Sequence, residues 1–168
     1  HEVNITGTLH IFQAALQQGV KRVVFAASSS TYGDSPGLPK VEDKIGKPLS
    51  PYAVTKYVNE LYADVFARTY GIEYIGLRYF NVYGPNEYHK GRMASVIWHA
   101  YNQITKTGKM KLFKSHKPDF KDGEQMRDFV YIKDVVNVLY FLMHHRKDSG
   151  IYNLGTGKAR TFLDLATQ

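Results

Sequence analysis

The sequence predicts an α/β fold built on a doubly wound parallel sheet. Val23–Ala27 is a short, nearly all-apolar run, which is typical of a parallel strand buried on both faces. A helical pattern at Tyr52–Tyr70 follows it, and Tyr74–Tyr79 is expected to form the next strand. This strand–helix–strand alternation favours a parallel sheet, and such sheets bind ligands at the carboxyl ends of their strands.

The first half of the chain carries clear start and stop signals. Asn4–Gln18 is expected to be a helix because apolar residues recur every three or four positions, and Gly19 would end it. Ser28–Pro51 is expected to be a long loop, and loops of this length are usually functional. The proline at its end marks the start of the next helix, and Gly71 follows that helix.

The second half predicts shorter elements and more irregular chain. We expect Thr161 to cap a last helix. Before it, the expected elements are a loop at Asn81–Gly91, a helix at Met93–Thr105, a strand at Lys111–Phe113, a loop at Lys114–Gln125, an extended segment at Arg127–Tyr131, a helix at Asp134–His145 and a strand at Ile151–Leu154.

Composition excludes several classes of protein. The 168 residues hold no cysteine, so we expect no disulfide and a cytoplasmic location, and the opening residues do not resemble a signal peptide. No apolar run is long enough to span a membrane. The formal charge is +7, but the basic residues are scattered, so we expect no nucleic-acid partner. The seven histidines lack the spacing of metal ligands, and no metal site is expected.

Tyr52 and Lys56 are the candidate acid–base pair. On a helix, residues four apart share one face, and a positive charge beside a phenol favours the phenolate. A hydroxyl from the serine run that begins at Ser28 could contact the same substrate oxygen. Such a set can move a proton on and off an alcohol while a hydride leaves the same carbon. The spacing alone is weak, because most such pairs are a solvated helix edge.

Several motifs in order make the pattern more specific. They are Ser28-Ser29-Ser30, Thr31-Tyr32-Gly33-Asp34, Ser50-Pro51-Tyr52 with Lys56, and Arg78-Tyr79-Phe80-Asn81-Val82-Tyr83-Gly84-Pro85. Together they resemble the extended short-chain dehydrogenase/reductase family, and within it the nucleotide-sugar epimerases and dehydratases. The resemblance implies a partial Rossmann-like sheet with part of a smaller substrate-binding region. Residues 1–85 would be the C-terminal half of the dinucleotide-binding domain, and residues 86–168 a substrate-binding segment with the last Rossmann elements.

The two halves resemble different members of that family. Up to about Phe80 the sequence motifs resemble those of UDP-hexose and UDP-N-acetylhexosamine 4-epimerases. Beyond it, Glu87-Tyr88-His89-Lys90-Gly91-Arg92 and Arg127-Asp128-Phe129-Val130-Tyr131 resemble ADP-glyceromanno-heptose 6-epimerase. Two alternatives therefore remain open. The chain is either a hybrid of two subfamilies or a natural sequence that carries the motifs of both.

The resemblance also implies roles for individual residues. Tyr52 would be the acid–base, Lys56 would tune it and bind the nicotinamide ribose, and Ser28 would contact the reacting sugar oxygen. Lys90 would be a second acid–base and Arg127 would bind the substrate diphosphate; a solvated lysine, and an ion pair from Arg127 to Asp128 or Asp134, are the alternatives. The implied cofactor contacts are Tyr52, Lys56, Tyr79, Val82 and Lys90, and the substrate contacts are Ser28, Ser29, Asn81, Arg92, His99, Phe113, Lys114, Ser115, His116 and Arg127.

The implied activity is NAD- or NADP-dependent epimerisation of a nucleotide-diphosphate sugar through a keto intermediate, as in precursors of lipopolysaccharide, by a homo-oligomeric enzyme. ADP-glyceromanno-heptose 6-epimerase is the first expectation and UDP-glucose or UDP-N-acetylglucosamine 4-epimerase the second. A non-catalytic folded fragment is the alternative of another class, because the chain lacks the GxxGxxG turn that holds a dinucleotide pyrophosphate. We expect the chain by itself to be an inactive fragment of an epimerase, and the choice between NAD and NADP stays open.

Overall fold

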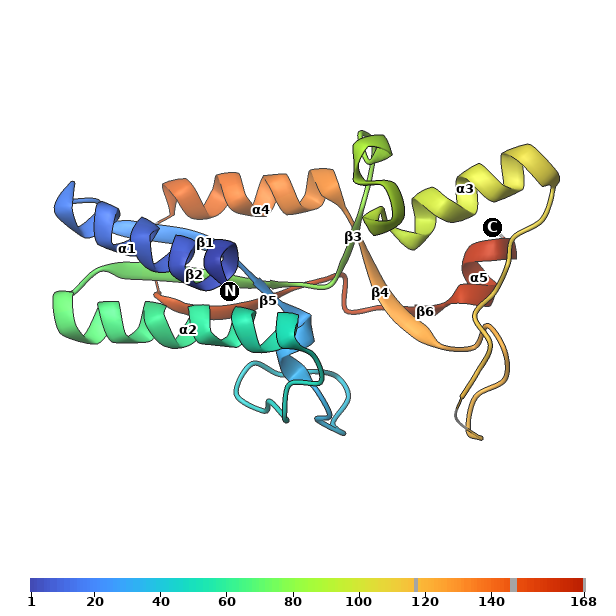
Figure 1. The fold of residues 1–168 in the computed structure, drawn as a ribbon, viewed down its shortest axis with the longest axis horizontal. Helices are drawn as coiled ribbons and strands as arrows, with labels where there is room; N and C mark the ends of the chain where they lie inside the picture. Colours follow the sequence, from blue (N-terminus) through green and yellow to red (C-terminus); the bar gives the residue numbers. More distant parts are fainter. Residues whose placement is uncertain (117, 146–147, 168) are drawn as a thin grey trace. The chain divides into compact units, whose positions relative to one another are not determined.

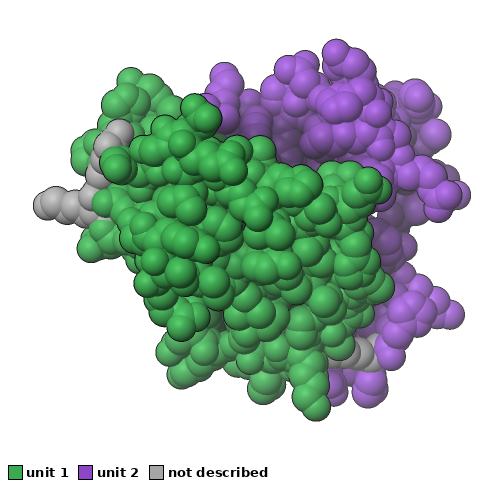
Figure 2. Space-filling model, turned by 60° about the vertical axis from the view of Figure 1, so that its left-hand side comes forward, with its two compact units in different colours: residues 1–79, 139–154 green, residues 80–138, 155–168 purple. Residues whose placement is uncertain are grey.

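The computed structural model describes residues 1–116, 118–145 and 148–167, which form two compact units (Figure 2). The first unit comprises His1–Tyr79 and Leu139–Leu154, and the second comprises Phe80–Val138 and Gly155–Gln168. No helix in the described residues is long and apolar enough to cross a membrane. The same residues contain no cluster of three or more histidine or carboxylate side chains that could hold a metal ion.

A parallel three-stranded sheet forms the centre of the first unit. Its strands are β1 (Arg22–Ser28), β2 (Glu73–Tyr79) and β5 (Gly150–Leu154), in the order β1-β2-β5 (Figure 1). β2 pairs in parallel with both neighbours. The predicted α/β class and the parallel sheet are therefore confirmed.

Two helices pack side by side against β1. A π-helical segment (Glu2–Thr6) leads into α1 (Gly7–Gln17), and α2 spans Pro51–Tyr70 (Figure 1). Their contact is made by aromatic rings, because the ring centroid of Phe12 lies 5.3 Å from that of Phe66 and 5.8 Å from that of Phe25 on β1. Phe12 is fully buried, so this cluster anchors both helices to the sheet.

Local signals set both ends of α2. The side chain of Ser50 accepts a hydrogen bond of 3.1 Å from the backbone N–H of Ala53, which satisfies one of the free donors of the first turn. Pro51 is the first helical residue, where a missing N–H costs nothing. Gly71 ends the helix in the left-handed conformation. The predicted boundaries of this helix are confirmed to within one residue.

The second unit contains a smaller mixed sheet. β4 (Met126–Tyr131) pairs in parallel with β3 (Asn81–Tyr83) and antiparallel with β6 (Ala159–Thr161). The second unit also contains a 3₁₀ segment (Tyr88–Met93) and the helices α3 (Val96–Thr107) and α5 (Phe162–Thr167), together with the first part of α4 (Ile132–His144), which continues into the first unit.

Side-chain caps set the starts of two of these helices. Thr161 accepts a hydrogen bond of 2.9 Å from the N–H of Asp164, whose carboxylate accepts one of 3.0 Å from the N–H of Thr161. This reciprocal pair confirms the predicted cap of the last helix. α3 begins at Val96, three residues later than predicted, because Ser95 caps it through the N–H of Trp98 at 3.2 Å.

Two expectations for the second unit were wrong. Asn81–Gly91, expected to be a loop, contains β3 and the start of the 3₁₀ segment. Lys111–Phe113, expected to be a strand, forms no sheet: the N–H of Lys111 donates to the side chain of Gln103 at 2.9 Å. The ring of Phe113 instead packs on Phe162, with centroids 5.0 Å apart. An apolar run of this length becomes a strand only when a neighbouring strand is in reach.

Candidate active site

Tyr52 and Lys56 lie together on the first turns of α2. The Nζ of Lys56 is 5.9 Å from the centroid of the Tyr52 ring, as expected for residues four apart on a helix. Tyr52 is 50% exposed, and within the described residues its hydroxyl makes no hydrogen bond. A phenol placed in this way can exchange a proton with a bound alcohol without first breaking a bond to the protein.

Lys56 ties α2 to the end of β1. Its ammonium donates a hydrogen bond of 2.9 Å to the backbone oxygen of Ala26, two residues before β1 ends at Ser28. Burial lowers the pKa of Lys56 from its ordinary value. The ammonium has three N–H donors, and the bond to Ala26 uses one of them. The other two remain for a ligand hydroxyl, which is the arrangement that a ribose would need.

The serine run after β1 presents a hydroxyl that can donate. The Oγ of Ser28 accepts hydrogen bonds from the N–H of Ser30 at 3.2 Å and from its Oγ at 2.8 Å. These two bonds use both acceptor positions of the Ser28 hydroxyl, so its own proton remains available for a substrate oxygen. Thr31 fixes the turn by donating to the backbone oxygen of Ser28 at 2.8 Å. Ser29 lies in the same 3₁₀ segment, Ser29–Tyr32.

Lys90 lies in the 3₁₀ segment of the second unit, next to a buried carboxylate. Its Nζ is 3.6 Å from Oε2 of Glu87, which is 4% exposed. Burial alone would raise the pKa of Glu87, but hydrogen bonds from Ser95 and Gly84 and the charge of Lys90 outweigh it and lower the pKa. Lys90 therefore pairs with a buried carboxylate, while its own side chain is 47% exposed.

Arg127 does not form either of the ion pairs considered as alternatives. In the part of the chain that the structure describes, it pairs with neither Asp128 nor Asp134. Its guanidinium lies 6.0 Å from the ring centroid of Phe162 and donates to its neighbour's backbone oxygen at 2.7 Å. The carboxylate of Asp128 instead accepts hydrogen bonds from the N–H groups of residues 156 and 157. Arg127 thus keeps donors for an anion.

The other predicted site residues lie in both units. Tyr79 ends β2, and burial raises its pKa. Asn81 begins β3 and donates to the backbone oxygen of Asp128 at 3.1 Å. The remaining positions are Val82 in β3, Arg92 in the 3₁₀ segment, His99 in α3, and Phe113, Lys114, Ser115 and His116 in the irregular chain that follows α3. Ser28, Ser29, Tyr52, Lys56 and Tyr79 belong to the first unit and the others to the second.

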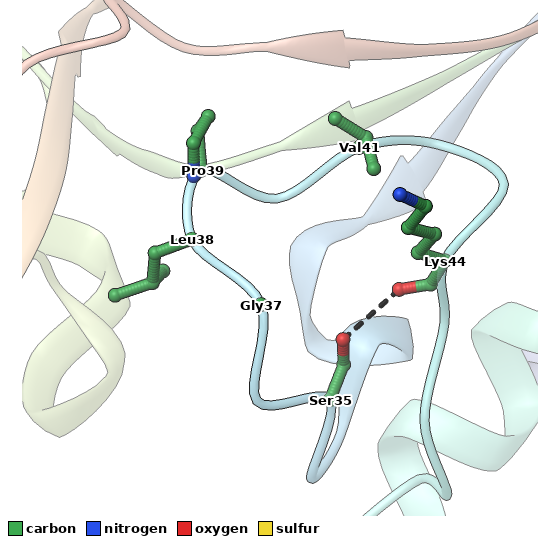
Figure 3. Close-up of a pocket in the computed structure, with 6 residues that line it drawn as sticks. All are labelled: Ser35, Gly37, Leu38, Pro39, Val41 and Lys44. Carbon is green, nitrogen blue, oxygen red and sulfur yellow. Dashed lines mark hydrogen bonds between the residues drawn. The ribbon is translucent and has the colours of Figure 1, made fainter.

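Two cavities of the described chain lie away from these residues in the sequence. One, of about 250 Å³, lies in the loop before α2, where the Oγ of Ser35 donates to the backbone oxygen of Lys44 at 3.0 Å (Figure 3). It is lined by Ser35, Gly37, Leu38, Pro39, Val41 and Lys44. A second, of about 580 Å³, is lined by Gln103, Thr107, Lys109, Met110 and Lys111. Neither contains a predicted site residue.

Sequence reasoning missed two buried acidic residues near the site. Glu60 on α2 forms an ion pair with Arg78 on β2 at 2.7 Å, and Glu87 binds Lys90. The signals were present: Arg78 is a charged residue inside a strand, and Glu60 follows Lys56 by one helical turn.

The chain matches a known protein family over most of its length. The family described as "NAD dependent epimerase/dehydratase family" matches residues 1–155. The ADP-L-glycero-D-manno-heptose-6-epimerase of Fusobacterium nucleatum is 44% identical over 169 residues, which cover 97% of this chain and 50% of that protein. The chain spans about half the length of the curated relatives it matches.

Solved structures resemble the chain over nearly all of its length. The UDP-N-acetylglucosamine 4-epimerase of Methanobrevibacter ruminantium, in complex with UDP-N-acetylmuramic acid, has a TM-score of 0.87 and 34% identity, covering 99% of this chain and 51% of its own. The UDP-glucose 4-epimerase of Thermus thermophilus, in complex with NAD, has a TM-score of 0.82 and 32% identity, covering 99% of this chain and 52% of its own.

Proposed function

The chain belongs to the NAD dependent epimerase/dehydratase family, and from that premise we propose that it supplies the acid–base centre of a nucleotide-sugar epimerase. The observation that carries the proposal is the placement of Tyr52 and Lys56 on one face of α2, with Lys56 bonded to β1 just before Ser28.

The donor set fits the nicotinamide end of a dinucleotide, NAD or NADP. Lys56 keeps two N–H donors beyond its bond to Ala26, and these suit ribose hydroxyls. Two phenols lie at the carboxyl edge of the sheet, where this fold binds ligands. That of Tyr52 is exposed, and that of Tyr79, on the cofactor side, is partly buried. Lys56, Tyr52 and Tyr79 would hold the nicotinamide end of the dinucleotide, and the bound cofactor would supply reversible hydride transfer.

Tyr52 moves the proton in this scheme. As the sugar carbinol becomes a ketone, Tyr52 acting as a phenolate takes the hydroxyl proton and becomes a phenol, which returns that proton when the alcohol forms again. The hydroxyl of Ser28 donates a hydrogen bond to the same sugar oxygen, because both of its acceptor positions are already used within the serine turn.

The substrate we propose first is ADP-glyceromanno-heptose, epimerised at C6. The 44% identity to a curated heptose epimerase supports it, as does the wording around Lys90. Lys90 would act as a second acid–base, and Arg127 would bind the diphosphate through donors that no carboxylate occupies in the described chain. A UDP-hexose 4-epimerase is the second candidate, favoured by the TM-score of 0.87 to the UDP-N-acetylglucosamine 4-epimerase.

Replacing the tyrosine hydroxyl tests the acid–base assignment. In the longest open reading frame that contains this chain, Tyr52→Phe should lower turnover of a nucleotide sugar by about 10²–10⁴-fold. Tyr70→Phe is the matched control, because Tyr70 is 55% exposed on the same helix and its ring contacts Phe66 in a tilted arrangement that does not need the hydroxyl. Equal turnover by the two variants would refute the role of Tyr52.

Lys90 separates the two candidate substrates. Lys90→Ala should abolish epimerisation of ADP-heptose and leave that of UDP-hexoses within a few-fold, since one tyrosine suffices for the latter. Lys106→Ala, an exposed lysine of α3, is the control. An equal, small effect on both sugars would make Lys90 a surface lysine.

A further inference from the structure

A bidentate ion pair is buried beneath the acid–base helix. Arg78, on β2, is 3% exposed and Glu60, on α2, is 5% exposed. The Nε of Arg78 donates to Oε1 of Glu60 at 2.9 Å, and Nη2 donates to Oε2 at 2.7 Å. Well-packed apolar residues often stabilise a fold as well as such a pair does, because burying two charges is costly. What the pair adds is a fixed geometry between two elements.

The same guanidinium reaches the loop that precedes α2. Its Nη1 donates to the backbone oxygen of Glu42 at 2.8 Å, and its Cζ lies 4.8 Å from the ring centroid of Tyr32. Tyr32 in turn donates to Oδ1 of Asn153 at 2.6 Å, and the N–H of Asn153 donates to the carboxylate of Glu42 at 2.7 Å. One arginine therefore holds α2, two strands and the loop in a single network.

The position of this network relates it to Tyr52 and Lys56. Glu60 follows them by eight and four residues, so the three side chains share one face of α2. In the sheet register Arg78 lies opposite Ala27, between Ala26, the acceptor of Lys56, and Ser28 at the end of the strand. The bidentate ion pair thus fixes the rotation of α2 about its axis and its position along β1, at the level where the proposed reacting groups lie.

We propose that Arg78 and Glu60 are positioning residues: their buried fork sets the placement of Tyr52 and Lys56 relative to Ser28. They touch neither substrate nor cofactor and act through α2. This inference rests on the proposed epimerase function. The experiment must therefore distinguish a failure of the positioning role from a failure of the epimerase function.

The decisive variant replaces both charges with apolar residues. In the longest reading frame that contains the chain, Glu60→Leu/Arg78→Met should have a melting temperature within a few degrees of that of the parent. Its kcat should nevertheless fall by about a hundredfold, with KM for the nucleotide sugar little changed, because a misplacement of about 1 Å has that effect on turnover. The control is Asp64→Leu/Arg68→Met, which removes an exposed ion pair of 2.7 Å on the same helix. The control should keep its kcat.

A conservative variant covers the case in which the double variant does not fold. Arg78→Lys keeps the charge and loses the two-pronged contact, so kcat should fall by about tenfold in a folded protein. Its crystal structure gives a readout independent of turnover: the 2.9 Å bond from Lys56 to the oxygen of Ala26 should be lost. A kcat within twofold of the parent, or an unchanged Lys56 bond, would overturn the positioning role. An inactive parent would instead overturn the proposed function.

Discussion

Replacing Glu87 with glutamine tests how the segment that carries Lys90 is held. Glu87 is 4% exposed and accepts three hydrogen bonds. Its Oε1 accepts from the N–H of Gly84 at 3.2 Å and from the hydroxyl of Ser95 at 2.7 Å, and its Oε2 accepts from the N–H of Ser95 at 2.7 Å. The Nζ of Lys90 completes the set at 3.6 Å.

The expected loss follows from these contacts. In Glu87→Gln, one carboxylate oxygen becomes an NH₂ group that cannot accept from the N–H of Ser95, so a buried donor loses its partner. An unsatisfied buried donor costs about 1–3 kcal/mol. The other two hydrogen bonds lose their charge, and charge-assisted bonds are about twice as strong as neutral ones. We expect the free energy of unfolding at neutral pH to fall by about 3 kcal/mol.

The loss should depend on pH in a defined direction. Burial would raise the pKa of Glu87, but the hydrogen bonds from Ser95 and Gly84 and the charge of Lys90 hold it below its ordinary value of 4.5. The unfolded chain therefore binds the proton first as the pH falls. The stabilisation by Glu87 is complete above the ordinary value and disappears as the pH falls through the folded pKa. The difference between parent and variant should shrink over that range.

Urea unfolding at several pH values measures both effects. Trp98 is the single tryptophan, and its backbone N–H donates to the side chain of Ser95, so its fluorescence reports on this part of the second unit. Glu2→Gln is the control, because Glu2 is exposed and no described residue binds its carboxylate. A loss for Glu87→Gln below about 0.5 kcal/mol, or a loss that stays constant as the pH falls, would refute the reasoning.

Three further predictions can be checked on the same protein. Gly33→Ala should lower the free energy of unfolding by more than about 3 kcal/mol, because Gly33 has φ +53° and its new Cβ would lie 1.8 Å from the backbone oxygen of Lys47. Gly19→Ala, with φ +66° and open space, should cost only about 1 kcal/mol, and equal losses in urea titrations would contradict this contrast. Asn59→Leu should raise the melting temperature, because the Oδ1 of Asn59 is buried without a hydrogen-bond donor in the described chain. A lower melting temperature would contradict this and would mean that Asn59 stabilises the fold. Lys56→Arg should lower turnover by about a hundredfold, since a longer, planar guanidinium would displace the charge from its bond to the oxygen of Ala26. Parent-like turnover would exclude a specific role for the ammonium.

Much of the fold could be predicted because its signals lie within a few residues. The apolar run that became β1, the cap at Ser50, the left-handed Gly71 and the reciprocal cap at Thr161 each act inside one turn or strand. The resemblance to the nucleotide-sugar epimerases is confirmed by the family match over residues 1–155 and by relatives of both subfamilies. The roles of the individual site residues stay predictions.

The sequence did not predict elements that exist only through a partner. β3 and β6 are three-residue strands, and each is defined by pairing with β4. Lys111–Phe113 has a comparable local pattern and becomes irregular chain, because its side-chain and backbone contacts go to α3 and Phe162 instead. Segments this short have too little intrinsic preference to choose their own structure.

By itself, the sequence determined the helix that carries Tyr52 and Lys56 and their spacing on one face of it. Only the tertiary structure decided that Lys56 bonds to Ala26, and that Glu60 and Arg78 are buried together. The physical reason is that helical spacing is fixed by backbone geometry within four residues, whereas the environment of a charge depends on residues distant in the chain. A charge that is costly to bury alone becomes a fixed contact once folding brings its partner to it.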